Sequence, residues 1–160
     1  MKTNNFEFFW GGVFSNFHPS EITIDGVKYF CVEQYFMAMK AVYFGDFETH
    51  KLIMKSTDPK TSKKLGRKVK NFDSDEWMKV CQDFMYKGCF AKFTQNKDLR
   101  DKLLNTGTKI LVEASPFDSI WGIKLDASDP NAQNEETWQG TNWLGKILTK
   151  IKNELKNENI

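Results

Sequence analysis

Residues 31–44, CVEQYFMAMKAVYF, combine an almost wholly apolar pattern with two charged residues, Glu33 and Lys40. The pattern predicts a helix, in which seven residues at about 100° each bring both side chains within roughly 20° of one face. A buried charge costs several kcal/mol unless it is paired or coordinated. A carboxylate and an amine on this face could therefore perform acid–base or nucleophilic chemistry. A structural ion pair, or a lysine that extends to water, would explain the same two residues.

Two further carboxylates stand in apolar surroundings. Glu113 lies in the strand-like segment KILVEAS, and Asp118 opens a tryptophan-containing loop. Each could act as an acid or a base near neutral pH. For Glu113, a structural role at the end of the strand is the favoured interpretation. The chain contains no GxSxG, P-loop, GxGxxG or HExxH motif.

The bulk composition is that of a folded domain with little net charge. The 160 residues are 40% hydrophobic and 14% aromatic, and the formal net charge is +2. This balance argues against a global basic field for nucleic acid. The segment KSTDPKTSKKLGRKVK, residues 55–70, is locally basic, with seven Lys and Arg against one Asp. It is interpreted as a solvated surface, with a phosphate-contact strip as the alternative.

Cysteine usage and the N-terminus indicate a reducing compartment. The three cysteines, Cys31, Cys81 and Cys89, have no metal-ligand spacing, and there are only two histidines. We therefore expect no metal site and no cofactor. The start, MKTNNFEFFWGG, lacks the apolar core of a signal peptide, and no run approaches the roughly 20 apolar residues of a membrane span. The expected location is cytoplasmic, with no membrane partner.

The order of elements predicts an α+β fold. FEFF predicts a strand, and EITI and VKYF flank an Asp-Gly turn typical of a hairpin. Helices are expected over 31–44, 45–56, 58–66, 73–95, 96–107 and 143–157, and a buried strand over 109–115. The prediction is a mainly helical single domain over residues 1–160 with a small antiparallel sheet. The long loop 115–142 contains Trp121 and Trp138, which favours a folded, functional loop.

An ordered set of short motifs suggests a family. The set comprises FSNFHP, IDGVKYFCVEQYFMAMKA, LGR, Trp77, KFTQN, LLNTG, LVEASPFDSIWG and GTNWLGKIL. With these motifs the chain resembles the YbiA-like NADAR family of N-glycosidases over nearly its whole length. The resemblance implies a YbiA-like fold and removal of a base or amine from C1 of a ribose. A non-catalytic module that binds ADP-ribose or another nucleotide is the alternative function.

The resemblance also implies two substrate classes. One is ADP-ribose attached to guanine bases in nucleic acid, and the other is a phosphorylated ribosylamino-pyrimidine of early riboflavin synthesis. In both, ribose is attached to an exocyclic amine, so the sugar ring can open to an imine. A neutral lysine could then form a Schiff base with C1, while direct hydrolysis by carboxylates is the other route. The sequence does not choose between a free metabolite and modified nucleic acid, and it does not indicate an oligomeric state.

Residue roles follow from positions within the matched motifs. Glu33 and Asp118 are expected to be catalytic, and Lys40 is the candidate for the covalent step. The base could stack on Trp77 or Trp121. Arg67 and Lys92 are the expected phosphate ligands, and the expected ribose ligands are Asn16, Asn96 and Asn142. Two departures from the family pattern, Ile123–Lys124 after Gly122 and Lys152 in place of an arginine, bear on substrate choice.

Overall fold

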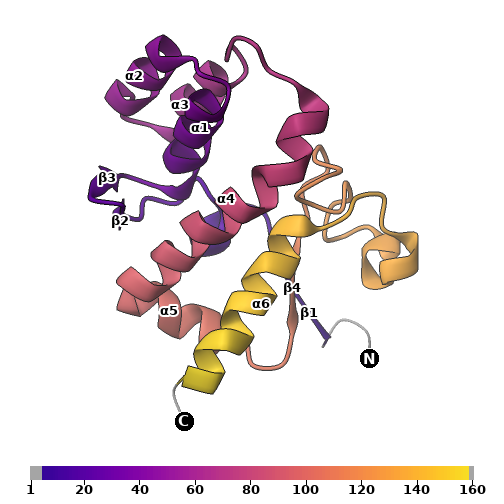
Figure 1. Cartoon of the computed structure of the whole chain (residues 1–160). Coiled ribbons are helices and arrows are strands. Elements are labelled where there is room, and N and C mark those ends of the chain that lie inside the picture. The colour runs from indigo at the N-terminus through magenta and orange to yellow at the C-terminus, as the bar shows by residue number, and fades with distance from the viewer. Residues whose placement is uncertain (1–4, 159–160) are drawn as a thin grey trace. The chain divides into compact units, whose positions relative to one another are not determined.

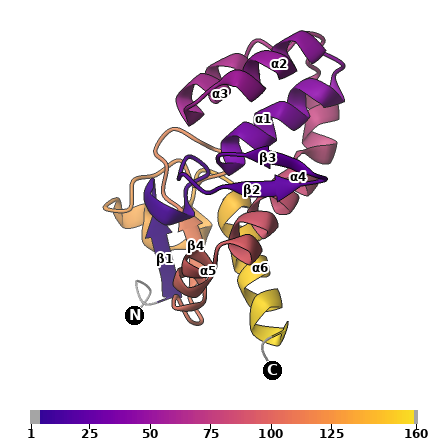
Figure 2. The same cartoon turned by 90° about the vertical axis from the view of Figure 1, so that its left-hand side faces the viewer.

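The computed structural model describes residues 5–158 and divides the chain into two compact units. Among the described residues, the first unit comprises residues 5–15 and 98–158, and the second comprises residues 16–97. Figures 1 and 2 show the elements from two directions. Within residues 5–158, no helix is both long and apolar enough to cross a membrane.

The second unit is built around helix α1 (Val32–Tyr43). Helices α2 (Phe47–Lys55), α3 (Pro59–Gly66) and α4 (Ser74–Gln95) all pack against α1, as Figure 2 shows. Strands β2 (Ile22–Ile24) and β3 (Val27–Tyr29) form the predicted antiparallel hairpin. Its turn residues Asp25 and Gly26 have positive φ values of 51° and 81°, as a type I′ turn requires.

Aspartates begin three of these helices. Asp46 and Asp58 cap α2 and α3 by accepting the backbone N–H groups of Thr49 and Thr61. Asp73 caps α4 in the same way. Pro59 occupies the first turn of α3, where a missing N–H costs nothing. The helix starts predicted at Asp46 and Asp58-Pro59 are confirmed.

Small residues bring α3 and α4 close to α1. A Cβ atom at Gly66 would lie 2.0 Å from the sulfur of Met37, and one at Gly88 would lie 2.9 Å from the ring of Tyr35. The face of α3 that contains Ser62 and Gly66 is therefore buried against its own unit. The core of this unit includes Ile22, Tyr35, Ile53, Met85 and Phe93, all at most 1% exposed.

The first unit contains strands β1 (Phe6–Phe9) and β4 (Ile110–Glu113) and helix α6 (Trp143–Glu158). The two strands pair in parallel, with Phe6 opposite Ile110 and Phe9 opposite Glu113, and α6 packs on β4. The sequence predicted both strands but not this parallel pair, because its partners are far apart in the chain. A single 3₁₀ turn, η2 (Gly12–Phe14), follows β1.

Helix α5 (Lys97–Leu104) begins at the last residue of the second unit and otherwise belongs to the first. It ends before the predicted Gly107, which follows in a turn with a φ of 66°. Lys152 donates to Thr106 Oγ1 and to the carbonyl of Lys109, and Lys156 donates to the carbonyl of Gly107. Burial lowers the pKa of Lys152 to about 8. Lys152, one of the departures from the family pattern, thus has a structural role in holding this turn.

The long loop 115–142 is folded, as predicted. Its residues Ile123, Leu125 and Ala132 form a buried cluster with Val112 and Ala114. Two short 3₁₀ segments, η3 (Pro130–Gln133) and η4 (Glu135–Thr137), lie in its second half. The indole N–H of Trp138 donates to the carbonyl of Ala132 at 2.8 Å, and the ring packs on Phe6. Trp138 therefore stabilises the folded loop through this hydrogen bond and this ring contact.

Candidate active site

Glu33 occupies the first turn of α1 and is only 7% exposed. Its backbone N–H donates to the carbonyl of Asn16 at 3.1 Å, which fixes the start of the helix. The N-terminal end of a helix stabilises a negative charge. Glu33 therefore places a carboxyl group in a largely buried position at the start of a helix, from where it could act as an acid or a base.

Lys40 lies two turns later on the same helix and is partly buried. Its Nζ atom lies 4.4 Å from the centroid of the Phe72 ring. Burial lowers the pKa of Lys40, while the charge of Glu33 opposes this effect and the charge of Arg67 adds to it. The structure thus brings Lys40 into electrostatic reach of both Glu33 and Arg67. A lysine with a lowered pKa contains more of the neutral amine that attacks an electrophile.

A second lysine near this helix is more deeply buried. Lys92 on α4 is 1% exposed, and burial lowers its pKa to about 8. Its charge and that of Glu33 both act on the thiol of Cys31, whose pKa burial raises to about 11. Lys92 also lies over the Phe93 ring, at 5.0 Å from the centroid. The expected role of Lys92 as a phosphate ligand stays a prediction, and the phosphate would have to reach a buried amine.

The spacing of apolar residues in the sequence indicates that Lys92 is buried, although the comparison of motifs does not use this spacing. Cys81, Met85, Cys89 and Lys92 follow one another at spacings of four, four and three, which is one face of a helix. The first three are at most 1% exposed. Lys92 continues this apolar stripe, so its burial follows from its helical position.

Asn16 lies against the same buried face of α4. Its side-chain N–H donates to the sulfur of Met85 at 3.3 Å, and its Oδ1 accepts from the thiol of Cys89 at 3.8 Å. Both contacts are weak, because sulfur is a poor hydrogen-bonding partner. The amide of Asn16 is thus close to the buried face of α4, and its expected role as a ribose ligand stays a prediction.

Trp77 is the centre of an aromatic cluster and is 7% exposed. Phe84 stacks on it with ring centroids 5.7 Å apart, and Phe36 lies 5.3 Å away at a tilted angle. Tyr43 and Phe44 also contact its ring, each at 6.1 Å. This packing favours a core role for Trp77, and base stacking by it stays a prediction. Phe72, at 44% exposed, is the more accessible ring beside Lys40.

Asn96 caps the end of α4. Its side-chain N–H donates to the carbonyls of Lys92 and Glu21. The neighbouring Gln95 binds both the N–H and the carbonyl of Thr23 on β2. These contacts tie α4 to the hairpin. The KFTQN motif therefore has a clear structural function, while the expected ribose contact by Asn96 stays a prediction.

The remaining predicted site residues, Asp118, Trp121 and Asn142, lie in the first unit. Asp118 Oδ1 accepts the N–H groups of Ile120 and Trp121 at 2.9 and 2.8 Å, which shapes the loop at the family-type segment DSIWG. The Trp121 ring is partly buried and contacts Trp143 edge-on at 5.7 Å. The geometry thus gives Asp118 a turn-forming role in addition to the catalytic role predicted for it.

Asn142 is fully buried and connects β4 with the start of α6. Its Oδ1 accepts the N–H of Glu113 at 2.9 Å, and its side-chain N–H donates to the carbonyl of Leu111 at 3.1 Å. Gly145 packs so closely that a Cβ atom there would lie 2.1 Å from the carbonyl of Leu111. The GTNWLG motif is therefore explained by backbone packing, and ribose binding by Asn142 stays a prediction.

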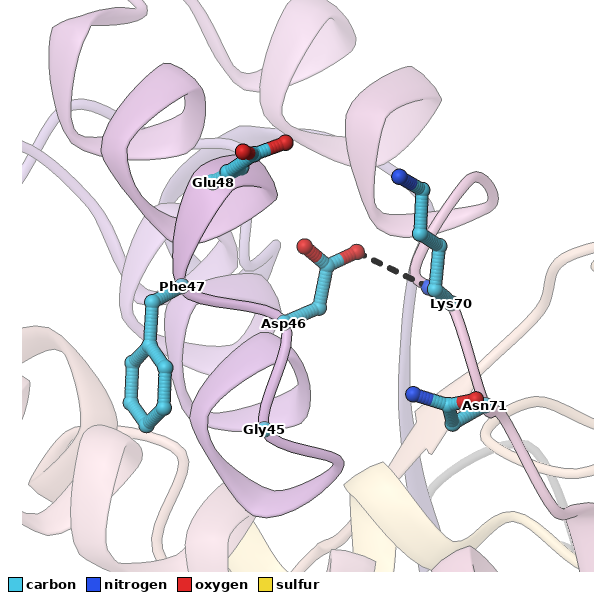
Figure 3. Close-up of a pocket in the computed structure, with 6 residues that line it drawn as sticks. All are labelled: Gly45, Asp46, Phe47, Glu48, Lys70 and Asn71. Atoms are coloured by element: carbon cyan, nitrogen blue, oxygen red, sulfur yellow. Dashed lines mark hydrogen bonds between the residues drawn. The ribbon is translucent and has the colours of Figure 1, made fainter.

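A cavity of about 320 Å³ lies at the N-terminal end of α2 (Figure 3). Its lining comprises residues 45–48, Lys70 and Asn71. Asp46 accepts the backbone N–H of Lys70 at 2.9 Å, and this bond together with those from Thr49 lowers the pKa of Asp46 to about 2. Asp46 is thus an ionised structural cap that joins α2 to the segment after α3.

Comparison with known proteins identifies the family to which this fold and these motifs belong. The model of the NADAR domain matches residues 8–156. The chain belongs to the NADAR domain family. It is 41% identical to the N-glycosidase R617 of Acanthamoeba polyphaga mimivirus, over 96% of this chain and 98% of that protein.

Two further relatives bear on the fold and on chemistry. The NMR structure of the E. coli protein YbiA matches with a TM-score of 0.80 and 28% identity, over 98% of this chain and 88% of YbiA. The YbiA-like fold predicted from sequence is thereby confirmed. A riboflavin biosynthesis protein of Vibrio vulnificus is 30% identical over 91% of this chain, which spans 36% of that longer protein. The assignment of residues 1–160 to a single domain stays a prediction.

Proposed function

We propose that this protein is a hydrolase that cleaves the N-glycosyl bond between C1 of a ribose and an exocyclic amine. Membership of the NADAR family and relatives named N-glycosidases support hydrolysis of an N-glycosyl bond. The observation that carries the chemistry is the nearly buried Glu33 on the same helix as Lys40, whose pKa is lowered. ADP-ribosylated guanine and a phosphorylated ribosylamino-pyrimidine are the two candidate substrates.

In the proposed reaction, Glu33 moves protons and Lys40 forms the covalent bond. Opening of the ribose ring gives an imine between C1 and the exocyclic nitrogen. The neutral amine of Lys40 adds to C1, and the exocyclic nitrogen takes one proton from Glu33 and one from the added lysine nitrogen. The base leaves as a free amine, and a protonated imine remains between Lys40 and C1. Water then adds to the lysine imine and releases the sugar, which restores Lys40 and the proton on Glu33. The net reaction consumes one water molecule.

Burial serves both proposed roles. An apolar environment keeps part of the Lys40 population neutral, as nucleophilic attack requires. Arg67 at the end of α3 adds positive charge near Lys40, and it also offers a bidentate phosphate ligand. The catalytic role of Asp118 and the stacking role of Trp121, both in the first unit, stay predictions.

Product release tests the proposal. The protein is incubated separately with an oligonucleotide containing ADP-ribosylated guanine and with a ribosylamino-pyrimidine phosphate, and chromatography follows the freed amine. Turnover of at least one substrate that is lost in Glu33→Gln supports the enzyme. Binding of ADP-ribose without turnover of either substrate would instead indicate the non-catalytic module.

A further inference from the structure

The basic segment of residues 55–70 forms an ordered surface on α3. Lys60, Lys63, Lys64 and Arg67 follow the spacing i, i+3, i+4 and i+7, which places them on one side of the helix. All four are exposed. Lys68 and Lys70, also exposed, continue the positive charge beyond the helix. We call Lys60, Lys63 and Lys64 of α3, with Arg67 at its C-cap, the basic face.

The acidic residue within this segment does not interrupt the basic face. Asp58 is the N-cap of α3, where its two oxygens accept the N–H of Thr61 at 2.9 Å and the Thr61 hydroxyl at 2.7 Å. The opposite side of α3 is fixed to its unit through Ser62 and Gly66. The basic face is therefore held outward on a rigid helix.

The basic face ends beside the proposed nucleophile. Gly66 packs on Met37, which is one helical turn before Lys40 on α1. Arg67, the next residue, is the last member of the basic face. The ring of Phe72, 44% exposed, lies under the Lys40 amine at 4.4 Å. A strand whose phosphates bind along the basic face would therefore extend toward the Lys40 amine and the exposed Phe72 ring.

We propose that the basic face binds the phosphodiester backbone of a single-stranded nucleic acid and that the modified base is presented to Lys40. This rests on the proposed function and selects, between its two candidate substrates, the base attached to a polynucleotide. From Lys60 to Arg67 the helix rises about 10 Å, the length of about three stacked nucleotides. A free metabolite would need only one of these phosphate sites, whereas a row of cations fits a row of phosphates.

A single strand suits the surface better than a duplex. The net charge of the chain is only +2, although residues 55–70 alone contribute +6, so the rest of the chain is net negative. Proteins that bind single strands combine a basic track with exposed aromatic rings on which bases stack. Phe72 offers such a ring at one end of the track. The cavity in Figure 3 is less suited to phosphate, because Glu48 is part of its lining.

The test measures binding and turnover separately. Fluorescence anisotropy with an unmodified, labelled 12-nucleotide oligo-dT compares wild type with Lys60→Glu/Lys63→Glu/Lys64→Glu. The matched control, Lys51→Glu/Lys102→Glu/Lys146→Glu, makes the same charge change at exposed sites on other helices. We expect at least tenfold weaker binding for the basic-face variant and less than threefold for the control. The salt dependence, d log K/d log [salt], should become shallower by about 2, because about three phosphate contacts are lost.

A second readout uses the modified guanine in two forms, as the single nucleoside and within an oligonucleotide. The basic-face variant should lose at least tenfold in kcat/KM on the oligonucleotide and keep its rate on the nucleoside. Glutamine substitutions at the same three lysines check that reversed charge has not disturbed α3. Equal loss in the control variant, or unchanged oligonucleotide binding by the basic-face variant, would overturn this proposal. Cleavage of neither guanine form by wild type, together with turnover of the ribosylamino-pyrimidine phosphate, would also overturn this proposal. Turnover of none of the three substrates would instead count against the proposed function, whatever the binding result.

Discussion

Lys40 and Glu33 influence one another across two turns of α1: burial lowers the pKa of the lysine, and the glutamate charge partly restores it. A structural ion pair between Glu33 and Lys40 is the alternative interpretation, and it would require only that the two side chains carry opposite charges. The proposed reaction needs more, namely a carboxylate that exchanges protons and an amine that is partly neutral. Substitutions that keep shape and change one of these properties can therefore distinguish the two roles.

Glu33→Gln keeps the volume and the hydrogen-bonding capacity of the side chain while it removes proton exchange. We expect this variant to fold with nearly unchanged stability and to lose at least about a hundredfold in kcat, the usual scale for a general acid or base. Single-turnover assays measure the loss, and urea denaturation measures stability. Unchanged turnover, or an unfolded variant, would assign Glu33 to structure.

Lys40 should form a covalent adduct that can be trapped. Borohydride added during turnover reduces an imine to a stable amine, and mass spectrometry should find the sugar on the peptide that contains Lys40. Lys40→Arg keeps the positive charge, and it should neither turn over normally nor trap. Lys92→Met is the control, because Lys92 is a second lysine near α1 whose pKa is lowered. Trapping at Lys92, or fast wild-type turnover with no adduct, would contradict the assignment.

Lys92 should make stability depend on pH. Its pKa is lowered from 10.5 to about 8 in the folded protein, so the unfolded chain binds more protons between these values. The contribution of Lys92 to the free energy of unfolding therefore rises as the pH increases from about 8 to 10.5, by on the order of a few kcal/mol. The stability of wild type minus that of Lys92→Met should increase over this range in urea titrations.

The stability of wild type must be compared with that of Lys92→Met, because the titration of Cys31 changes stability in the opposite direction. Burial raises the pKa of Cys31 from 9.0 to about 11, so its contribution to stability falls as the pH rises from about 9 to 11. Cys31 is present in both proteins and largely cancels. A difference that stays flat between pH 8 and 10 would show that Lys92 is not desolvated in solution.

Local signals predicted much of this fold, and long-range packing set the rest. The Asp-Gly hairpin and the helix starts at Asp46 and Asp58 follow from turn and capping chemistry within a few residues. The parallel pairing of β1 with β4 depends on packing between segments far apart in the chain. The helical pattern of residues 31–44 made Glu33 and Lys40 candidates, but a lysine is usually exposed, so the burial of Lys92 was not predicted.

Trp121 should report on ligand binding if residues 115–142 form one wall of the substrate pocket. We expect the tryptophan fluorescence of wild type to change when ADP-ribose is added. Trp121→Phe should lose most of that change and keep an aromatic contact with Trp143. Trp138→Phe is the control, since its ring packs inside the loop. A full signal in Trp121→Phe would move the stacking ring elsewhere, with Phe72 the next residue to test.

Asn142 gives the clearest contrast between a structural and a binding role. Its amide satisfies two buried backbone groups, the N–H of Glu113 and the carbonyl of Leu111, from a backbone with a positive φ of 53°. Asn142→Leu leaves both groups without that partner, at about 1–3 kcal/mol each, so we expect a loss of about 2–6 kcal/mol in the free energy of unfolding. Asn71→Leu is the matched control, because Asn71 has a similar φ of 63° on an exposed segment. Its loss should be limited to the strain of a leucine in the left-handed region.

Urea denaturation of both variants separates lost hydrogen bonds from strain. If Asn142→Leu is no less stable than Asn71→Leu but has a raised KM, the amide belongs to the substrate site.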